Sequence, residues 1–133
     1  MPRIADVMRP DFIAVAPEDT LGEVAERMEQ LDVDSALVVQ FGQLIGILTA
    51  HDLLHALAGR AHPSEARVRQ WMTAEPIVVS ADASIEKAAV LMTEYRIHQL
   101  PVVEGERPIG LIGLHHVTRS AVTAAHPAIG LGF

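Results

Sequence analysis

The stretch VDSALVVQFGQLIGILTAHD, residues 33–52, returns in modified form as IHQLPVVEGERPIGLIGLHH, residues 97–116. Each stretch has two apolar runs that favour β-strands, separated by a short polar loop, which is the pattern of a β-hairpin. They differ after the second run, because Thr49 and Asp52 of the earlier stretch have a glycine and a histidine as their counterparts. The sequence therefore predicts a repeated fold in which one copy keeps polar chemistry that the other lacks.

The repetition covers nearly the whole chain. Sliding the sequence by 64 residues aligns two segments without a gap. The residues of the earlier copy that recur identically at this spacing include Met8, Ile13, Val15, Ala25, Met28, Val38, Val39, Ile45, Gly46 and His51. The alternative is chance similarity between two strings rich in Val, Ile and Ala. The ungapped alignment favours a duplicated unit.

Each copy predicts the order β-α-β-β-α. Residues 12–15 and 76–79 predict a first strand, followed by a helix. Thr20 and Glu23 have the capping-box spacing that begins a helix, and Ser84 supplies the cap in the later copy. A hairpin and a closing helix complete each copy. The apolar helix positions predicted to face the core are Leu21, Val24, Ala25, Met28 and Leu31, and then Ile85, Ala88, Ala89, Met92 and Tyr95.

The period divides the chain into segments that together form one module. Residues 1–60 are the predicted first repeat, 61–67 the connector, 68–123 the second repeat and 124–133 a C-terminal tail. A chain of 133 residues that is 50% hydrophobic is long enough to bury a core. The predicted fold class is α/β (α+β). The tail is apolar and contains glycine, so it either lies on the surface or is disordered.

Charge and composition exclude several classes of partner. The net charge is −7 and only ten residues are Lys or Arg, which argues against binding to nucleic acid or to an anionic membrane surface. The chain has no cysteine, so it has no disulfide, thiolate metal site or cysteine nucleophile. It also shows no signal peptide and no uninterrupted apolar stretch of membrane-spanning length. We expect a soluble, cytoplasmic protein.

The duplicated unit, the IHQLPVV run (97–103), the VRQWM start of the second copy (68–72) and the GILTAHD ending of the first hairpin (46–52) resemble the CBS domain. The resemblance runs from about residue 4 to about residue 122. It implies two β-α-β-β-α repeats packed through their sheets about a pseudo-twofold axis. Modules of this family often form disc-like homodimers and commonly sense adenine nucleotides such as AMP, ADP or ATP, with no required cofactor.

The chemistry of Thr49 and Asp52 supports the same kind of ligand. A carboxylate at a helix start can accept hydrogen bonds from both hydroxyls of a ribose, and a threonine hydroxyl one turn earlier can reach a neighbouring phosphate. The helix N-terminus adds free amides and the positive end of a dipole. The alternative is structural: Thr49 caps the closing helix and Asp52 completes a capping box. Both roles can hold together.

The resemblance implies further contacts. It places cationic groups for phosphate at Arg69 and His98, and it places the base against the backbone of Val33 and Asp34. For Arg69 the alternative is a solvated surface charge, and for His98 a histidine packed between repeats. The apolar residues that the resemblance puts around the base are Ile13, Ile47 and Ile77.

The corresponding place in the second copy is poorer. Gly113 has no hydroxyl, and His116 cannot accept ribose hydroxyls as a carboxylate does. The counterpart of His98 is Asp34, whose charge repels phosphate. We expect one nucleotide site per chain, formed by the first copy and completed by the second.

Other functions compete with this one. Seven histidines invite a metal site, with His51 and His55 at helical ligand spacing, but no zinc-binding motif is present. No motif of a hydrolase, a P-loop enzyme or a dinucleotide enzyme occurs, so we expect no enzymatic activity. The remaining alternative is a ligand-free module that dimerises or regulates another protein in trans. The apolar residues expected to form its dimer face, although some of them must simply pack inside the monomer, are Leu53, Leu54, Leu57, Val117 and Val122.

Overall fold

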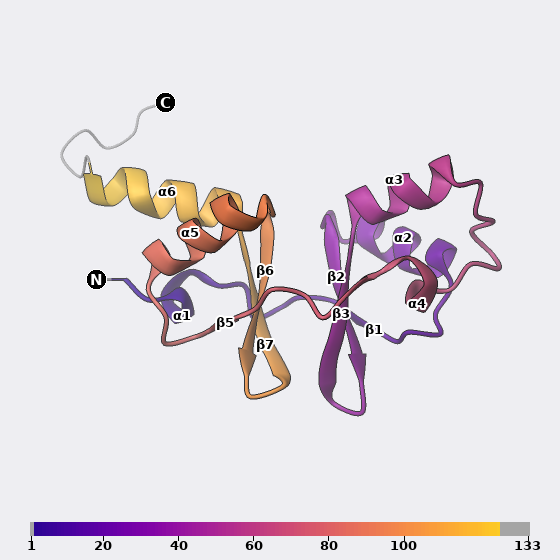
Figure 1. Cartoon of the computed structure of the whole chain (residues 1–133), viewed down its shortest axis with the longest axis horizontal. Helices are drawn as coiled ribbons and strands as arrows, with labels where there is room; N and C mark the ends of the chain where they lie inside the picture. Colours follow the sequence, from indigo (N-terminus) through magenta and orange to yellow (C-terminus); the bar gives the residue numbers. More distant parts are fainter. Residues whose placement is uncertain (1, 126–133) are drawn as a thin grey trace. The chain divides into compact units, whose positions relative to one another are not determined.

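The structure is a computed structural model that describes the backbone of residues 2–125 and the side chains of residues 2–119. It confirms the α/β class and the repeated β-α-β-β-α order (Figure 1). In chain order the elements are α1 (Ile4–Val7), β1 (Ala14–Val15), α2 (Leu21–Gln30), β2 (Ser35–Gln40), β3 (Gln43–Thr49), α3 (Ala50–Ala58), α4 (Val68–Trp71), β4 (Thr73–Ala74), β5 (Val79–Ser80), α5 (Ile85–Tyr95), β6 (Gln99–Glu104), β7 (Arg107–Gly113) and α6 (Leu114–Ala125). The predicted tail lies almost wholly outside the described residues.

The chain forms two compact units, and each is described by itself. The first-repeat unit comprises Asp11–Pro76 and Glu106–Pro108. The second-repeat unit comprises, of the described residues, 2–10, 77–105 and 109–125. No helix in the described part of the chain is long and apolar enough to cross a membrane.

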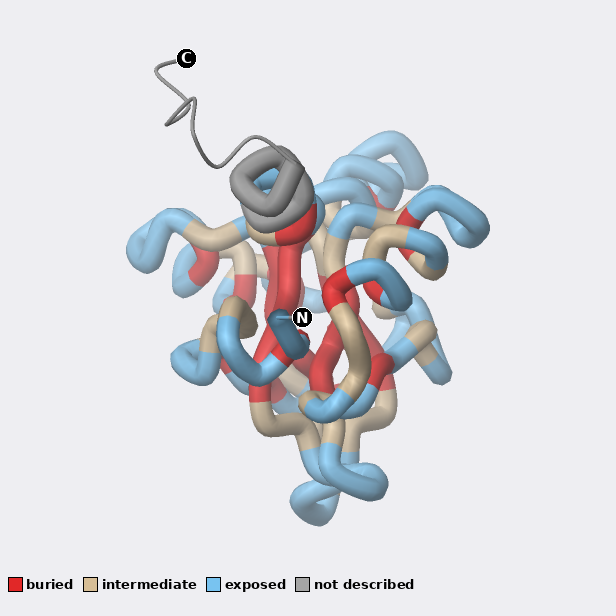
Figure 2. The backbone as a smooth tube through the Cα atoms, turned by 90° about the vertical axis from the view of Figure 1, so that its left-hand side faces the viewer, coloured by how far each residue is buried: buried red, intermediate tan, exposed pale blue. Residues whose placement is uncertain are grey.

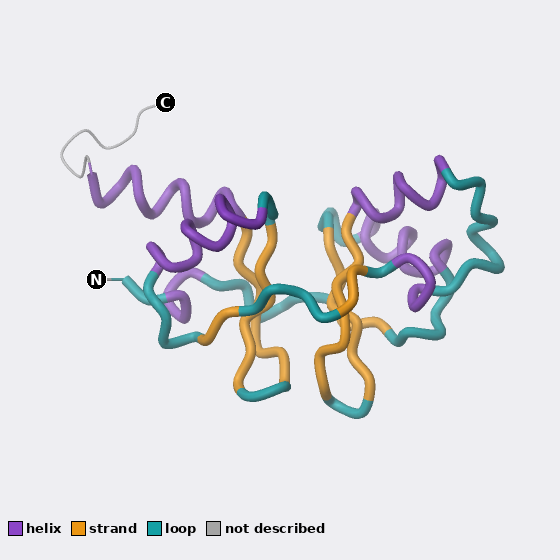
Figure 3. Tube along the Cα trace, in the orientation of Figure 1, coloured by secondary structure: helices purple, strands orange, loops and turns teal. Residues whose placement is uncertain are grey.

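A four-stranded sheet in the order β1-β2-β3-β4 supports the first-repeat unit (Figure 3). β1 runs parallel to β2 because α2 connects them, while β3 pairs antiparallel with both of its neighbours. Val24 and Met28 of α2 and Ala56 of α3 pack with Val38 and Leu48 in one apolar core. Long stretches of the strands are buried, and the helices carry further buried residues (Figure 2).

The second-repeat unit repeats this plan with the sheet order β5-β6-β7. Its core joins α5 to the sheet through Ala88 and Met92, packed against Leu100, Val102 and Ile112. The hydroxyl of Ser84 accepts a hydrogen bond from the N–H of Lys87 at 3.2 Å, as expected for the helix cap.

The two units exchange their leading segments. α4 and β4, which open the second sequence repeat, belong to the first-repeat unit, where Thr73 of β4 pairs with Ile47 of β3. α1, which opens the first sequence repeat, belongs to the second-repeat unit, where Arg9 forms a bridge with Leu111. Each compact unit therefore contains the core of one repeat and the beginning of the other.

Two recurring glycines explain why this exchange needs particular residues. A Cβ atom on Gly46 would lie 2.6 Å from Sδ of Met72, and one on Gly110 would lie 2.6 Å from Sδ of Met8. A distance that short is a clash, so the glycines allow the exchanged segments to approach the sheets. This close packing accounts for the recurrence of both residue types at the 64-residue spacing.

The predicted connector is anchored on α2. The first-turn amides of Leu21 and Gly22 donate to the carbonyls of Ala66 and Pro63, at 3.0 Å and 2.9 Å. The predicted capping box of Thr20 and Glu23 is also present, and the bond from the Thr20 hydroxyl is the main cause that lowers the pKa of the Glu23 carboxyl. The beginning of α2 is thus satisfied by both side chains and backbone.

Two residues predicted to face the core are exposed. Leu31 follows the last residue of α2 as its C-cap, and Tyr95 is the last residue of α5. At these helix ends the apolar face of the helix no longer packs against the sheet, and both side chains are more than half exposed. The predictions for these two positions were wrong because the buried positions of the two helices end at Met28 and Met92.

The predicted dimer face is only partly exposed. Val117 is buried in the core of the second-repeat unit, so it is one of the residues that pack inside the monomer rather than on that face. Leu53 is half-buried against the core of the first-repeat unit, whereas Leu54 and Leu57 are each 63% exposed on α3. The side chain of Val122 lies outside the described residues.

The two hairpin turns differ in their residues. Phe41 and Gly42 join β2 to β3, and both have positive φ, 53° and 77°. The equivalent first turn residue between β6 and β7 is Gly105, with φ 65°. Phe41 is 93% exposed, so its ring gains no packing from the described part of the chain.

Candidate functional site

Thr49 and Asp52 form the expected capping box at the start of α3. The Thr49 N–H donates to Oδ2 of Asp52 at 2.9 Å, and the Asp52 N–H donates to Oγ1 of Thr49 at 3.2 Å. The Thr49 hydroxyl also donates to Oδ2 of Asp52, at 3.1 Å. The structural role that the sequence left open for this pair is therefore confirmed.

Three more residues of the first-repeat unit meet this pair. Oγ1 of Thr73, in β4, donates to Oδ1 of Asp52 at 3.4 Å. The carbonyl of Asp34 accepts from the N–H of Ala50 at 2.9 Å, which holds Asp34 at the first turn of α3. Ser35 pairs with Thr49 across β2 and β3. We call these residues the Asp52 cluster: Asp34, Ser35, Thr49, Asp52 and Thr73.

Ser35 is unusual within this cluster. Its side chain is 2% exposed, and its Oγ is the one buried side-chain polar atom without a hydrogen-bond partner among the described residues. A buried hydroxyl without a partner costs free energy, roughly 1–3 kcal/mol. The cluster therefore holds a hydrogen-bonding group that the described part of the chain leaves unsatisfied.

The capping box limits what the cluster can bind. Oδ2 of Asp52 already accepts two hydrogen bonds from Thr49, whereas among the described residues Oδ1 accepts only the long bond from Thr73. A carboxylate oxygen has two lone pairs, so Oδ1 keeps room for a hydroxyl donor such as a sugar. The Thr49 hydroxyl donates its hydrogen to Asp52. It would have to break this hydrogen bond to donate to a phosphate.

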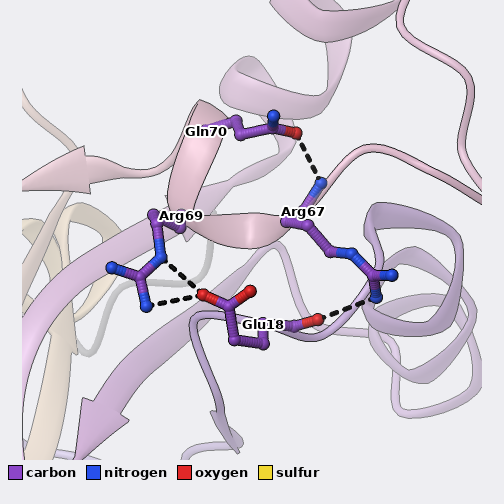
Figure 4. Close-up of polar contacts among 4 residues, drawn as sticks. All are labelled: Glu18, Arg67, Arg69 and Gln70. Carbon is purple, nitrogen blue, oxygen red and sulfur yellow. Dashed lines mark hydrogen bonds and ion pairs between the residues drawn. The ribbon is translucent and has the colours of Figure 1, made fainter.

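Arg69 contacts a carboxylate rather than standing free (Figure 4). Its Nε and Nη2 atoms lie 2.6 Å and 2.5 Å from Oε1 of Glu18, in the loop between β1 and α2. Nη1 of Arg67 donates to the backbone carbonyl of Glu18 at 3.0 Å. The Arg67 N–H donates to Oε1 of Gln70 at 2.8 Å. The cation proposed for phosphate is therefore neutralised by Glu18.

The residues expected around the base lie in different environments. Ile13 and Ile47 are buried, with Ile13 in the core of the first-repeat unit. Val33 is half-buried against that core. Ile77 packs against the core of the second-repeat unit. Of the predicted site residues, the structure brings Asp34, Thr49 and Asp52 together.

His98 belongs to the second-repeat unit and is exposed. Its carbonyl accepts from the N–H of Leu114 at 2.8 Å, which matches the bond from Ala50 to Asp34 in the other unit. The backbone of the two helix starts is therefore the same, and the side chains differ.

His116 caps α6 in the way that Asp52 caps α3. Its Nδ1 accepts a hydrogen bond from the N–H of Gly113 at 3.2 Å, which requires the neutral imidazole. Burial, followed by the nearby charges of His115, Arg9 and Arg119, lowers the pKa of His116 below its ordinary value. The rings of His115 and His116 lie 3.9 Å apart. One neutral acceptor thus replaces the carboxylate.

Sequence reasoning missed three residues of this region. Thr73 and Glu18 reach their partners through contacts between segments 21 and 51 residues apart. Ser35 left a signal, because it is a lone hydroxyl at the start of an apolar strand. Among the described residues, no group of three or more His, Cys, Asp or Glu could hold a metal ion. The ring of His55 instead packs edge-on against Trp71 at 5.8 Å.

Comparison with known proteins identifies the fold. The CBS domain family model matches residues 4–59 and 68–122. The CBS domain-containing protein YhcV of Bacillus subtilis is 29% identical over 114 residues, 86% of this chain and 81% of that protein. A crystal structure of CBSX2 in complex with AMP has a TM-score of 0.79 at 25% identity, over 94% of this chain and 99% of that one.

A further solved structure agrees in fold alone. The CBS domain pair of protein MJ0100, crystallised with 5′-methylthioadenosine and S-adenosyl-L-methionine, has a TM-score of 0.84 at 23% identity. It covers 93% of this chain and 98% of that one.

Proposed function

The chain belongs to the CBS domain family, and on this premise we propose that it is a regulatory CBS pair that binds an adenosine-containing ligand at the Asp52 cluster. AMP, ADP and ATP are the nucleotide candidates, and no cofactor is required. The observation that carries the proposal is the remaining acceptor capacity of Asp52 Oδ1, in a cluster that also contains Ser35, whose buried hydroxyl has no hydrogen-bond partner among the described residues. The AMP complex of CBSX2 supports the same class of ligand.

The chemistry follows from the cluster. Asp52 would accept ribose hydroxyls at Oδ1, with Thr73 free to turn from its long bond. The backbone of Val33 and Asp34 would contact the base, and Ile13, Ile47 and Ile77 would line the apolar side. Arg69 and His98 remain the proposed phosphate contacts. The signal would pass through a homodimer or a protein effector in trans, in the cytoplasm.

Thermal unfolding with AMP, ADP, ATP and adenosine tests the proposal. A ligand that binds only the native state must raise the melting temperature. Asp52→Ala should remove this increase, because each charged hydrogen bond contributes roughly 1.5–3 kcal/mol, about a tenfold or greater change in affinity. His116→Ala is the matched control, since it removes the equivalent cap of α6 and should keep the ligand-induced increase. No increase with any of the four compounds would reject the proposal.

Exposed Leu54 and Leu57 favour a second candidate, a ligand-free dimerisation module. Sedimentation of the wild type and of Leu54→Asn/Leu57→Asn would test it. This candidate would be favoured over the first if the wild type sediments as a dimer, the double variant sediments as a monomer, and adenosine compounds leave the melting temperature unchanged.

A further inference from the structure

Three groups in the first-repeat unit that were expected near the phosphate already have an internal acceptor. Arg69 is bound by the carboxylate of Glu18. The Thr49 hydroxyl donates to Asp52, and the N–H of Ala50 donates to the carbonyl of Asp34. A phosphate group would have to compete with these acceptors, whereas a ribose hydroxyl needs only Oδ1 of Asp52.

The charge of the units points the same way. The first-repeat unit contains twelve acidic and five basic residues, so it carries the entire net charge of −7. The second-repeat unit contains five of each and is neutral, with histidine counted as neutral. A phosphorylated ligand at the Asp52 cluster therefore meets a repulsive field that an uncharged adenosine compound does not.

Glu18 is the acid that binds the cation expected to hold the phosphate. Arg69 precedes Thr73 by four residues, which span at most about 14 Å, and Thr73 contacts Asp52. The loop that carries Glu18 is held through its backbone: Arg67 donates to the Glu18 carbonyl, and the N–H groups of Arg69 and Val68 donate to the carbonyls of Pro17 and Asp19. A change in the Glu18 side chain therefore leaves the loop anchored.

We propose that Glu18 determines the charge selectivity of the adenosine site. While its carboxylate binds Arg69, the site prefers adenosine compounds whose 5′ substituent carries no net negative charge. A 5′-phosphate gains Arg69 only when it displaces Glu18. This inference rests on the proposed function and adds to it a specificity-determining residue and a class of preferred ligand.

The effect should be moderate, since both side chains of the pair are more than half exposed to solvent. Calorimetric titration would compare AMP with adenosine in the wild type and in Glu18→Gln. We expect the wild type to bind adenosine at least as tightly as AMP. In Glu18→Gln the ratio of AMP affinity to adenosine affinity should rise by about fivefold, and the rise should shrink as salt is added.

Two further proteins make the test specific. Glu29→Gln removes the same charge from the opposite end of α2. Its ratio of AMP affinity to adenosine affinity should equal that of the wild type. The double variant Glu18→Gln/Arg69→Gln should not show the raised ratio of AMP affinity to adenosine affinity, because that rise depends on Arg69.

Equal ratios in the wild type and Glu18→Gln, with both ligands bound, would overturn the role of Glu18. So would a gain of the same size in Glu29→Gln. Wild-type protein that binds AMP more tightly than adenosine would overturn the charge preference. No binding of either ligand in any variant would reject the adenosine site itself.

Discussion

The starts of α3 and α6 occupy equivalent places in the two units but differ in chemistry. Both helices begin with the same backbone bond, from Ala50 to Asp34 and from Leu114 to His98. At α3 a carboxylate accepts three hydrogen bonds, and at α6 an imidazole accepts one. The comparison teaches that the duplicated fold is maintained by backbone bonds and core packing, which leaves the side chains at the helix starts free to diverge.

The largest expected effect tests the shared part of that comparison. Leu48 and Ile112 are equivalent core residues with no exposed surface. Truncation of either to alanine should lower the free energy of unfolding by about 2–5 kcal/mol, because a buried cavity remains. Urea unfolding measures both. Leu54→Ala, at an exposed site, should change it by less than about 0.5 kcal/mol. A loss below about 1 kcal/mol in either core variant would show that the two cores are not equivalent.

Next in size is the difference between the two caps. Asp52→Ala leaves the Thr49 N–H without its acceptor and should cost about 1–2 kcal/mol. His116→Ala removes a single neutral acceptor and should cost less, about 0.5–1 kcal/mol. Urea unfolding without ligand at about pH 7.5 compares them. An equal or larger loss in His116→Ala would contradict the assignment of the stronger cap to α3.

Acidification should affect the α6 cap selectively. The pKa of His116 is lowered in the folded state, so the unfolded chain binds a proton more readily, and stability falls as the pH drops through about 6.5. Protonation also removes the acceptor for the Gly113 N–H. His116→Asp should reduce the loss of melting temperature between about pH 7.5 and about pH 5.5. His51→Asn is the control and should retain it. The same loss in His116→Asp would exclude His116 as its cause.

The smallest effect concerns the hairpin turns. Phe41 has a positive φ, whereas its counterpart Gly105 adopts one without strain. Phe41→Asn should raise the free energy of unfolding by about 0.5–1 kcal/mol, because Asn-Gly suits a turn with two positive φ angles. Thermal unfolding measures the gain, and Gly105→Asn should give none. A destabilised Phe41→Asn would mean that the exposed ring has a packing role.

The sequence predicted most of the architecture because apolar spacing and capping residues act locally. The helices capped by Thr20, Thr49 and Ser84 begin where they were expected. The exchange of leading segments was not predictable from the repeat. The two copies align at a shift of 64 residues whether the first segment of each copy packs in its own unit or in the other one. Distant contacts, such as Arg69 with Glu18, leave no periodic signal.

The exchange of leading segments limits where the chain can be truncated. A polypeptide of residues 1–60 would lack α4 and β4, and β3 would then present an unpaired edge that favours aggregation. Separate expression of the first-repeat unit therefore requires a cut after residue 76, beyond the boundary that the sequence repeat suggests.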